Sequence, residues 1–150
     1  MKVLVTGGLG FIGSHLVIQL VKNNYDVVII DNLYNSKKKT HKRLEVICKR
    51  KITLYVDDLK NISRLNNIFA SNQIDCVIHL AGYKSVSESM KYPKKYFVNN
   101  FYNSSLLIKA MKQNNIKKLL FSSSATVYGK PTYLPIDENH ALKPVNFYGK

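Results

Sequence analysis

Five short apolar runs, separated by segments with helical periodicity, constrain the fold more than any other feature of the sequence. The runs are VLV, DVVII, ITLYV, CVIHL and KLLFS, at residues 3–5, 26–30, 52–56, 76–80 and 118–122. They are nearly continuous in Val, Ile and Leu, as is typical of strands buried on both faces of a parallel sheet. The alternation predicts an α/β fold with a doubly wound parallel sheet, covered by helices on both faces.

Four segments between these runs carry apolar side chains at helical spacing, namely 12–23, 38–48, 61–70 and 93–114. Such a stripe predicts the helix face that packs on the sheet. The segment 129–144 contains three of the four prolines and predicts a long loop. The residues expected to form the apolar stripes are Ile12, Leu16 and Leu20, then Leu44 and Ile47, then Ile62, Leu65 and Phe69, and finally Phe97, Phe101, Ile108 and Met111.

A glycine-rich turn, VLVTGGLGFIGSHL, joins the first strand to the first helix. Gly7 permits a tight turn, Gly10 lets the backbone approach a diphosphate, and Gly13 lets the helix lie close to the sheet. The free N–H groups of the helix end favour an anion. The pattern, in this strand–turn–helix context, predicts a dinucleotide site.

Acidic residues end the next two strands. Asp31 lies 18 residues after Gly13, where a carboxylate can accept hydrogen bonds from both ribose hydroxyls and favours NAD over NADP. The alternative role of Asp31 is to cap a turn. Asp57 and Asp58 end the third strand, where either can accept from an adenine amino group and one can cap the following helix.

Charge and cysteine content exclude some classes of protein. The net charge is +14, but the lysine clusters flank one predicted helix without aromatic residues on which bases could stack. We interpret the charge as a bias spread over solvated surfaces, which attracts a diphosphate without implying a nucleic-acid partner. No apolar run approaches the roughly 20 residues of a membrane span. Cys48 and Cys76 have no disulfide or metal spacing, which favours the cytoplasm and no metal site.

A serine and a tyrosine follow the fifth strand. The segment FSSSATVYG ends this strand, and Ser124 is expected to project into the crevice. Tyr148 follows a long loop, at the predicted start of a helix. A tyrosine of this kind takes a proton from a sugar or alcohol hydroxyl when a lysine one helical turn later favours its phenolate. Lys150 comes only two residues after Tyr148, about 200° around a helix, and cannot replace that lysine.

Six motifs together, VLVTGGLGFIGSH, DNLYNS, DCVIHLAGYKSV, the NN at 99–100, FSSSATVYG and FYGK, resemble the N-terminal half of the UDP-glucose (UDP-galactose) 4-epimerases. These enzymes belong to the extended short-chain dehydrogenase/reductase family. The resemblance implies that residues 1–150 form a Rossmann-type NAD-binding domain, truncated, with the C-terminal nucleotide-sugar part absent. It implies NAD contacts from Gly7, Gly10, Phe11, Ile12, Gly13, Asp31, Asn32, Asn35, Ser36, Asp58, Leu59, Leu80, Ala81, Gly82, Lys84 and Asn99.

The resemblance also implies a catalytic pair, Ser124 and Tyr148, with Thr126 beside them at the UDP-sugar. The complete enzyme would interconvert UDP-glucose and UDP-galactose by reversible oxidation at sugar C4 and would form a homodimer. The 150-residue chain itself is expected to be inactive, because the partner lysine of Tyr148 is missing.

Related enzymes with other reactions remain as alternatives. Sugar dehydratases of the family need an Asp-Glu pair after the strand-end hydroxyl, where this chain has Ala125 and Thr126, so dehydration is disfavoured. A UDP-glucuronate-type epimerase or decarboxylase and a non-catalytic NAD-binding module stay open. Asn103 stands where relatives often have glycine and is expected to loosen the contact between helix and sheet.

Overall fold

The computed structural model describes all residues, Met1–Lys150, which divide into two compact parts. The sheet part comprises residues 1–81 and 103–122, and the second part comprises residues 82–102 and 123–150. None of the helices combines the length and the apolar character that a bilayer span requires.

The sheet part is built on five parallel strands, β1 Lys2–Thr6, β2 Asp26–Asp31, β3 Thr53–Val56, β4 Cys76–His79 and β5 Lys118–Phe121. Their order across the sheet is β3-β2-β1-β4-β5, with every neighbouring pair parallel. All five strands predicted from the apolar runs are therefore confirmed, and so is the parallel sheet.

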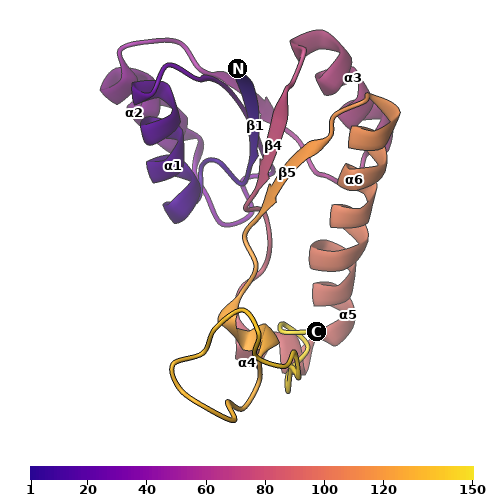
Figure 1. The fold of residues 1–150 in the computed structure, drawn as a ribbon. Helices are drawn as coiled ribbons and strands as arrows, with labels where there is room; N and C mark the ends of the chain where they lie inside the picture. The colour runs from indigo at the N-terminus through magenta and orange to yellow at the C-terminus, as the bar shows by residue number, and fades with distance from the viewer. The chain divides into compact units, whose positions relative to one another are not determined.

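Helices cover the two faces of this sheet (Figure 1). On one face lie α1 Phe11–Lys22 and α2 Lys38–Cys48, and on the other lie α3 Ile62–Asn72 and α6 Asn103–Gln113. Alternate residues of each strand enter opposite cores, because side chains of a strand point to opposite faces. Thus Val3 and Val5 pack with α1 and α2, whereas Leu4 packs with α3 and α6.

The buried face of α1 differs from the predicted stripe. Ile12 is 62% exposed, and the buried residues are Gly13, Val17 and Val21. Gly13 sits so close to the preceding turn that a Cβ there would collide with the Gly7 carbonyl oxygen. This close approach turns the glycine face, rather than Ile12, toward the sheet.

The other helices of the sheet part agree better with the prediction. In α3, Leu65 and Phe69 are buried as expected, together with Ile68. In α2, Leu44 is buried, but Ile47 is exposed and its expected burial is wrong. The partly buried His41 and Cys48 lie at i−3 and i+4 from Leu44 and share its face instead.

The segment 93–114 is not one regular helix. It consists of α5 Pro93–Tyr96, a π-helix at Phe97–Tyr102 and then α6. Because a π-helix closes i→i+5 hydrogen bonds, it shifts every later side chain from the positions that a 3.6-residue period predicts. The burial expected for Phe97, Phe101 and Ile108 is wrong, whereas Met111 is buried as predicted.

The second part has few regular elements. It contains α4 Val86–Lys91, which the sequence did not predict, then α5, the π-helix and a 3-10 turn at Ala125–Val127. Ser85 caps α4 by accepting a hydrogen bond from the Glu88 amide at 3.2 Å. The segment 129–144 has no helix or strand, as its prolines predicted.

Strand β5 departs from the expectation that every strand is covered on both faces. It pairs only with β4, and its apolar side chains Leu119, Leu120 and Phe121 are all exposed. The apolar run of β5 resembles those of the central strands, so the sequence alone did not distinguish this edge strand from them.

Adjacent residues of α6 test the observed register of the buried face. Leu107 is 0% exposed and Ile108 is 52% exposed. We expect Leu107→Ala to lower the free energy of unfolding by about 2–4 kcal/mol, because it leaves a cavity in the core. Ile108→Ala should change it by about 0.5 kcal/mol or less. Urea unfolding followed by circular dichroism measures both, and equal losses would contradict the register.

Candidate functional site

The centre of the sheet contains the point where the strand order reverses. Strand β1 pairs with both β2 and β4, so the connections after β1 and β4 diverge at their carboxyl ends. Ligands of open α/β sheets bind in the crevice at such a point. Gly7 follows β1 with φ of +68°, and a Cβ on it would lie 2.9 Å from the Ala81 amide nitrogen after β4. Glycine is required there for both reasons.

The turn after β1 leaves the end of α1 open for an anion. Gly10 is the N-cap and supplies no capping side chain, and the first turn of the helix contains no acidic residue. The first bond within the helix runs from the Ser14 amide to the Gly10 carbonyl at 2.9 Å. The preceding N–H groups therefore have no side-chain cap, and Phe11 and Ile12 are exposed beside them. These donors suit a diphosphate.

The carboxylate of Asp31, 8% exposed, ties β2 to this turn. Its Oδ2 accepts from the Leu9 amide at 3.0 Å, and its Oδ1 accepts from the Leu33 amide at 2.9 Å and the Ser36 hydroxyl at 2.7 Å. Asp31 thus caps a turn, which was the alternative reading. A carboxylate has about four acceptor sites, so three donors leave capacity for a ribose hydroxyl. Asn35 is exposed in the same loop.

Asp58 connects the loops after β2 and β3. Its Oδ2 accepts from Asn32 Nδ2 at 3.1 Å, and its Oδ1 accepts from the Lys60 amide at 3.0 Å. Asn103 of α6 contacts the same Oδ1 through Nδ2 at 3.4 Å, and its own Oδ1 is buried without a partner. The wider side chain at 103 is therefore accommodated within the helix–sheet contact. Leu59 is buried in the core beside α3.

Neither aspartate caps α3, contrary to the possibility left open by the sequence. Asn61 does so, because its Oδ1 accepts from the Arg64 amide at 3.0 Å. Asp57 pairs with the Arg64 side chain at 2.8 Å. Asp58 is therefore the acid after β3 that belongs to the Asn32 loop.

The last residues of β1 and β4, Thr6 and His79, form a polar cluster with Ser104 of α6 that the sequence did not predict as part of the site. Thr6 Oγ1 lies 2.6 Å from His79 Nδ1, and His79 Nε2 lies 2.7 Å from Ser104 Oγ. Thr6 and His79 are buried. Burial lowers the pKa of His79 from 6.5 to about 4, so the imidazole is neutral at pH 7.

The second part holds the predicted catalytic residues. Ser124 Oγ lies 3.0 Å from Thr126 Oγ1 and accepts from the Thr126 amide at 3.3 Å. The Tyr148 amide donates to Ser89 Oγ at 3.1 Å. The Tyr148 ring meets the buried Tyr96 ring edge-on, with 6.4 Å between the ring centres. A Cβ on Gly149 would lie 2.6 Å from the Thr126 carbonyl oxygen, so the two turns lie side by side.

Residues 147–149 form a hydrogen-bonded turn after Asn146 and are not assigned as a helix, so the helix start at Tyr148 stays a prediction. The Asn146 side chain accepts from the Gly149 amide at 2.7 Å, and the Lys150 amide donates to the Asn146 carbonyl at 3.1 Å. Lys150 Nζ lies 5.1 Å from the centre of the Phe147 ring rather than beside Tyr148.

Asn100 fixes the segment of the second part that carries Gly82 and Lys84. Its side chain accepts from the Tyr83 amide at 2.8 Å and donates to the Tyr83 carbonyl at 2.7 Å. Asn99 donates to Asn100 at 2.8 Å, and Lys84 is exposed. The NN pair was noticed in the sequence, but the double contact of Asn100 was not predicted.

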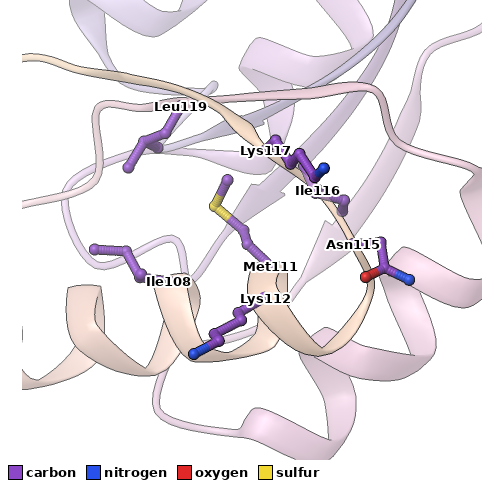
Figure 2. Close-up of a pocket in the computed structure, with 7 residues that line it drawn as sticks. All are labelled: Ile108, Met111, Lys112, Asn115, Ile116, Lys117 and Leu119. Carbon is purple, nitrogen blue, oxygen red and sulfur yellow. The ribbon is translucent and has the colours of Figure 1, made fainter.

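A shallow apolar hollow lies between the end of α6 and the start of β5 (Figure 2). Its lining includes Ile108, Met111 and Leu119, together with Lys112 and Lys117. Because it is at the amino end of β5, it lies away from the carboxyl ends where Asp31 and Ala81 stand. No group of three or more His, Cys, Asp or Glu side chains is arranged to hold a metal ion.

The strand order and the glycine turn at the point of reversal define a Rossmann-type α/β domain. A sequence model of the family described as GDP-mannose 4,6 dehydratase matches residues 4–150, so the chain belongs to this family.

Named relatives are similar to this chain in sequence, and solved structures are similar to it in fold. The chain is 43% identical over 150 residues to a UDP-glucose 4-epimerase of Bacillus subtilis and 46% identical over 149 residues to one of Dictyostelium discoideum. The two matches cover 100% and 99% of this chain, but only 44% and 43% of the length of the two relatives. A structure of UDP-glucose 4-epimerase from Bifidobacterium longum, in complex with NAD+ and UDP, is 45% identical with a TM-score of 0.97, over 99% of this chain and 45% of that one.

The buried histidine predicts a specific pH dependence of stability. An unfolded histidine binds its proton below about pH 6.5, whereas His79 in the folded chain does so only near pH 4. The contribution of the neutral His79 side chain to the free energy of unfolding is therefore complete above pH 6.5. On the order of 3 kcal/mol of this free energy is lost as the pH falls from 6.5 to 4.

Urea unfolding at several pH values measures this effect. His79→Phe should remove that component of the pH dependence, whereas the same substitution at the exposed His15 should retain it. Identical pH profiles for wild type and His79→Phe would contradict the assignment.

Proposed function

We propose that this chain is the NAD-binding part of an enzyme that interconverts UDP-glucose and UDP-galactose. The observation that carries the proposal is the buried Asp31 carboxylate, bonded at 3.0 Å to the Leu9 amide of the glycine turn. It brings a ribose acceptor and an uncapped helix end into one loop cluster, as an adenosine diphosphate requires. The relatives with bound NAD support the same ligand.

The residues of the sheet part would divide the dinucleotide among them. The turn Gly7–Gly13 would hold the diphosphate, and Asp31, with Asn32, Asn35 and Ser36 in its loop, would hold the adenosine ribose. Asp58 and Leu59 would lie at adenine, and Leu80 and Ala81 at the nicotinamide half. Gly82, Lys84 and Asn99 of the second part would complete the set.

The second part would supply the proton chemistry. Tyr148 would take the proton of the sugar 4-hydroxyl, and Ser124 would hydrogen-bond the same oxygen, with Thr126 beside it. Bound NAD would supply the hydride acceptor that makes oxidation at C4 reversible. The turn Ser124–Val127 contains no carboxylate, which favours epimerisation over the dehydration named in the family description.

Two further features of the whole protein are part of the proposal. Exposed aromatic residues on and beside the π-helix support a homodimer, with the Phe97 and Phe101 rings stacked at 5.1 Å. The two free cysteines support a cytoplasmic location. A UDP-glucuronate-type enzyme and a non-catalytic NAD-binding module are the alternatives that the experiments below distinguish.

Asp31 and Asp26, the last and first residues of β2, form a matched pair for a binding test. NADH binding to the chain is followed by nucleotide fluorescence. We expect Asp31→Asn to weaken binding about 10-fold or more, because hydrogen bonds to a charged acceptor contribute about 1.5–3 kcal/mol. Asp26→Asn should bind as wild type does. NADPH should bind at least about 10-fold more weakly than NADH, since its 2′-phosphate would meet the Asp31 carboxylate. Equal affinity of wild type and Asp31→Asn for NADH, or equal affinity of wild type for NADH and NADPH, would contradict the role of Asp31 at the ribose.

A second test uses the purified protein that contains this chain, with UDP-galactose as substrate. We expect formation of UDP-glucose, and Tyr148→Phe should lower kcat about 100-fold or more, as loss of a general base does. NADH binding without turnover would favour the non-catalytic module, and turnover of UDP-glucuronate alone would favour the uronate-type enzyme.

A further inference from the structure

The cluster of Thr6, His79 and Ser104 joins the ends of β1 and β4, where the strand order reverses, to α6. Buried polar groups are costly unless they are hydrogen-bonded. The neighbouring strand positions Val5 and Ile78 are buried and apolar. Packing alone therefore does not require a hydroxyl and an imidazole here, and their hydrogen bonds need another explanation.

The hydrogen bonds define the protonation of each member. Thr6 Oγ1 accepts from the Leu80 and Ala81 amides, both at 3.2 Å. Two donors occupy its acceptor sites, so its own proton is directed to His79 Nδ1 at 2.6 Å. Nδ1 is then the acceptor, and the proton of the neutral ring lies on Nε2, which donates to Ser104 Oγ at 2.7 Å.

This chain of bonds ends on the turn after β4. The Leu80 amide also reaches the Thr6 carbonyl at 3.2 Å, while Ala81 lies past the end of β4. The Ala81 amide nitrogen is the group that a side chain on Gly7 would strike. Thr6 therefore holds the β4 turn against the glycine turn.

We propose that Thr6 and His79 are positioning residues that hold the Leu80–Ala81 backbone in the conformation needed beside the nicotinamide half of the dinucleotide. His79 orients the Thr6 hydroxyl, and the hydroxyl fixes the two amides. The inference rests on the proposed NAD site for its functional consequence. The hydrogen bonds themselves can be tested without nucleotide.

The first experiment examines the side chains by nuclear magnetic resonance of the ¹⁵N-histidine-labelled chain. His79 should show the Nε2–H tautomer at pH 7, and the Nδ1–H tautomer would overturn the proposal. Amide exchange is then compared between Ala81 and the core residue Val77. Thr6→Val and His79→Phe should raise the relative exchange of Ala81 at least about 10-fold, whereas Thr6→Ser, which keeps the hydroxyl, should retain protection. Unchanged exchange in Thr6→Val would also overturn it.

The second experiment measures the Kd for NADH in the same variants. Thr6→Val and His79→Phe should each raise the Kd about 10-fold. The Kd of the double variant should not exceed the higher of the two single-variant values, because both changes break the same chain of hydrogen bonds. Thr6→Ser should stay within about 3-fold of wild type, as should Val5→Ala, which weakens the core on β1 but keeps the cluster. Equal effects of Val5→Ala and Thr6→Val would overturn the positioning role.

The two proposals fail in different ways. If the wild-type chain takes up no NADH, the proposed function of the site is wrong, and the tautomer and the exchange rates still decide whether the cluster fixes the turn. If the wild type binds NADH and Thr6→Val binds it equally well, the positioning role is wrong and the NAD site stands.

Discussion

The hydrogen bond between the buried Asp31 carboxylate and the Leu9 amide is the contact on which the rest of the site depends. It joins the end of β2 to the glycine turn after β1, so the acid and the helix end act as one unit. Asp31 also orders its own loop through Leu33 and Ser36. These three donors hold the carboxylate in one orientation, which is the preorganisation that the proposed ribose acceptor needs.

The strands and the sheet could be predicted because each buried strand is a continuous apolar run, a signal that needs no knowledge of tertiary contacts. The helix faces were harder to predict, for identifiable reasons. Gly13 carries no apolar side chain, yet it is buried, and a Cβ there would collide with the Gly7 carbonyl oxygen. In the segment 93–114, the π-helix changes the period, and no sequence signal marked where it begins at Phe97.

In the site, too, features with a local sequence signal could be predicted, and features that depend on tertiary contacts could not. Glycine spacing and a strand-end acid have a local signature, so the turn at 7–13 and Asp31 were visible in the sequence, and their hydrogen bonds agree with the assigned roles without testing them. The Thr6–His79–Ser104 cluster has no such signature, because its members are 73 and 25 residues apart. Its only signal is a polar residue inside or at the end of an otherwise apolar run, which is costly unless paired. Asn100 could be located by its motif, but its double contact with Tyr83 could not.

A crystal structure of the chain grown with NAD would test the central claim most directly. We predict the hydroxyls of the adenosine ribose within hydrogen-bonding distance of Asp31, and the diphosphate against the first turn of α1. A nucleotide bound elsewhere, or a ribose that leaves the Asp31 carboxylate with only its Leu9, Leu33 and Ser36 donors, would contradict the account.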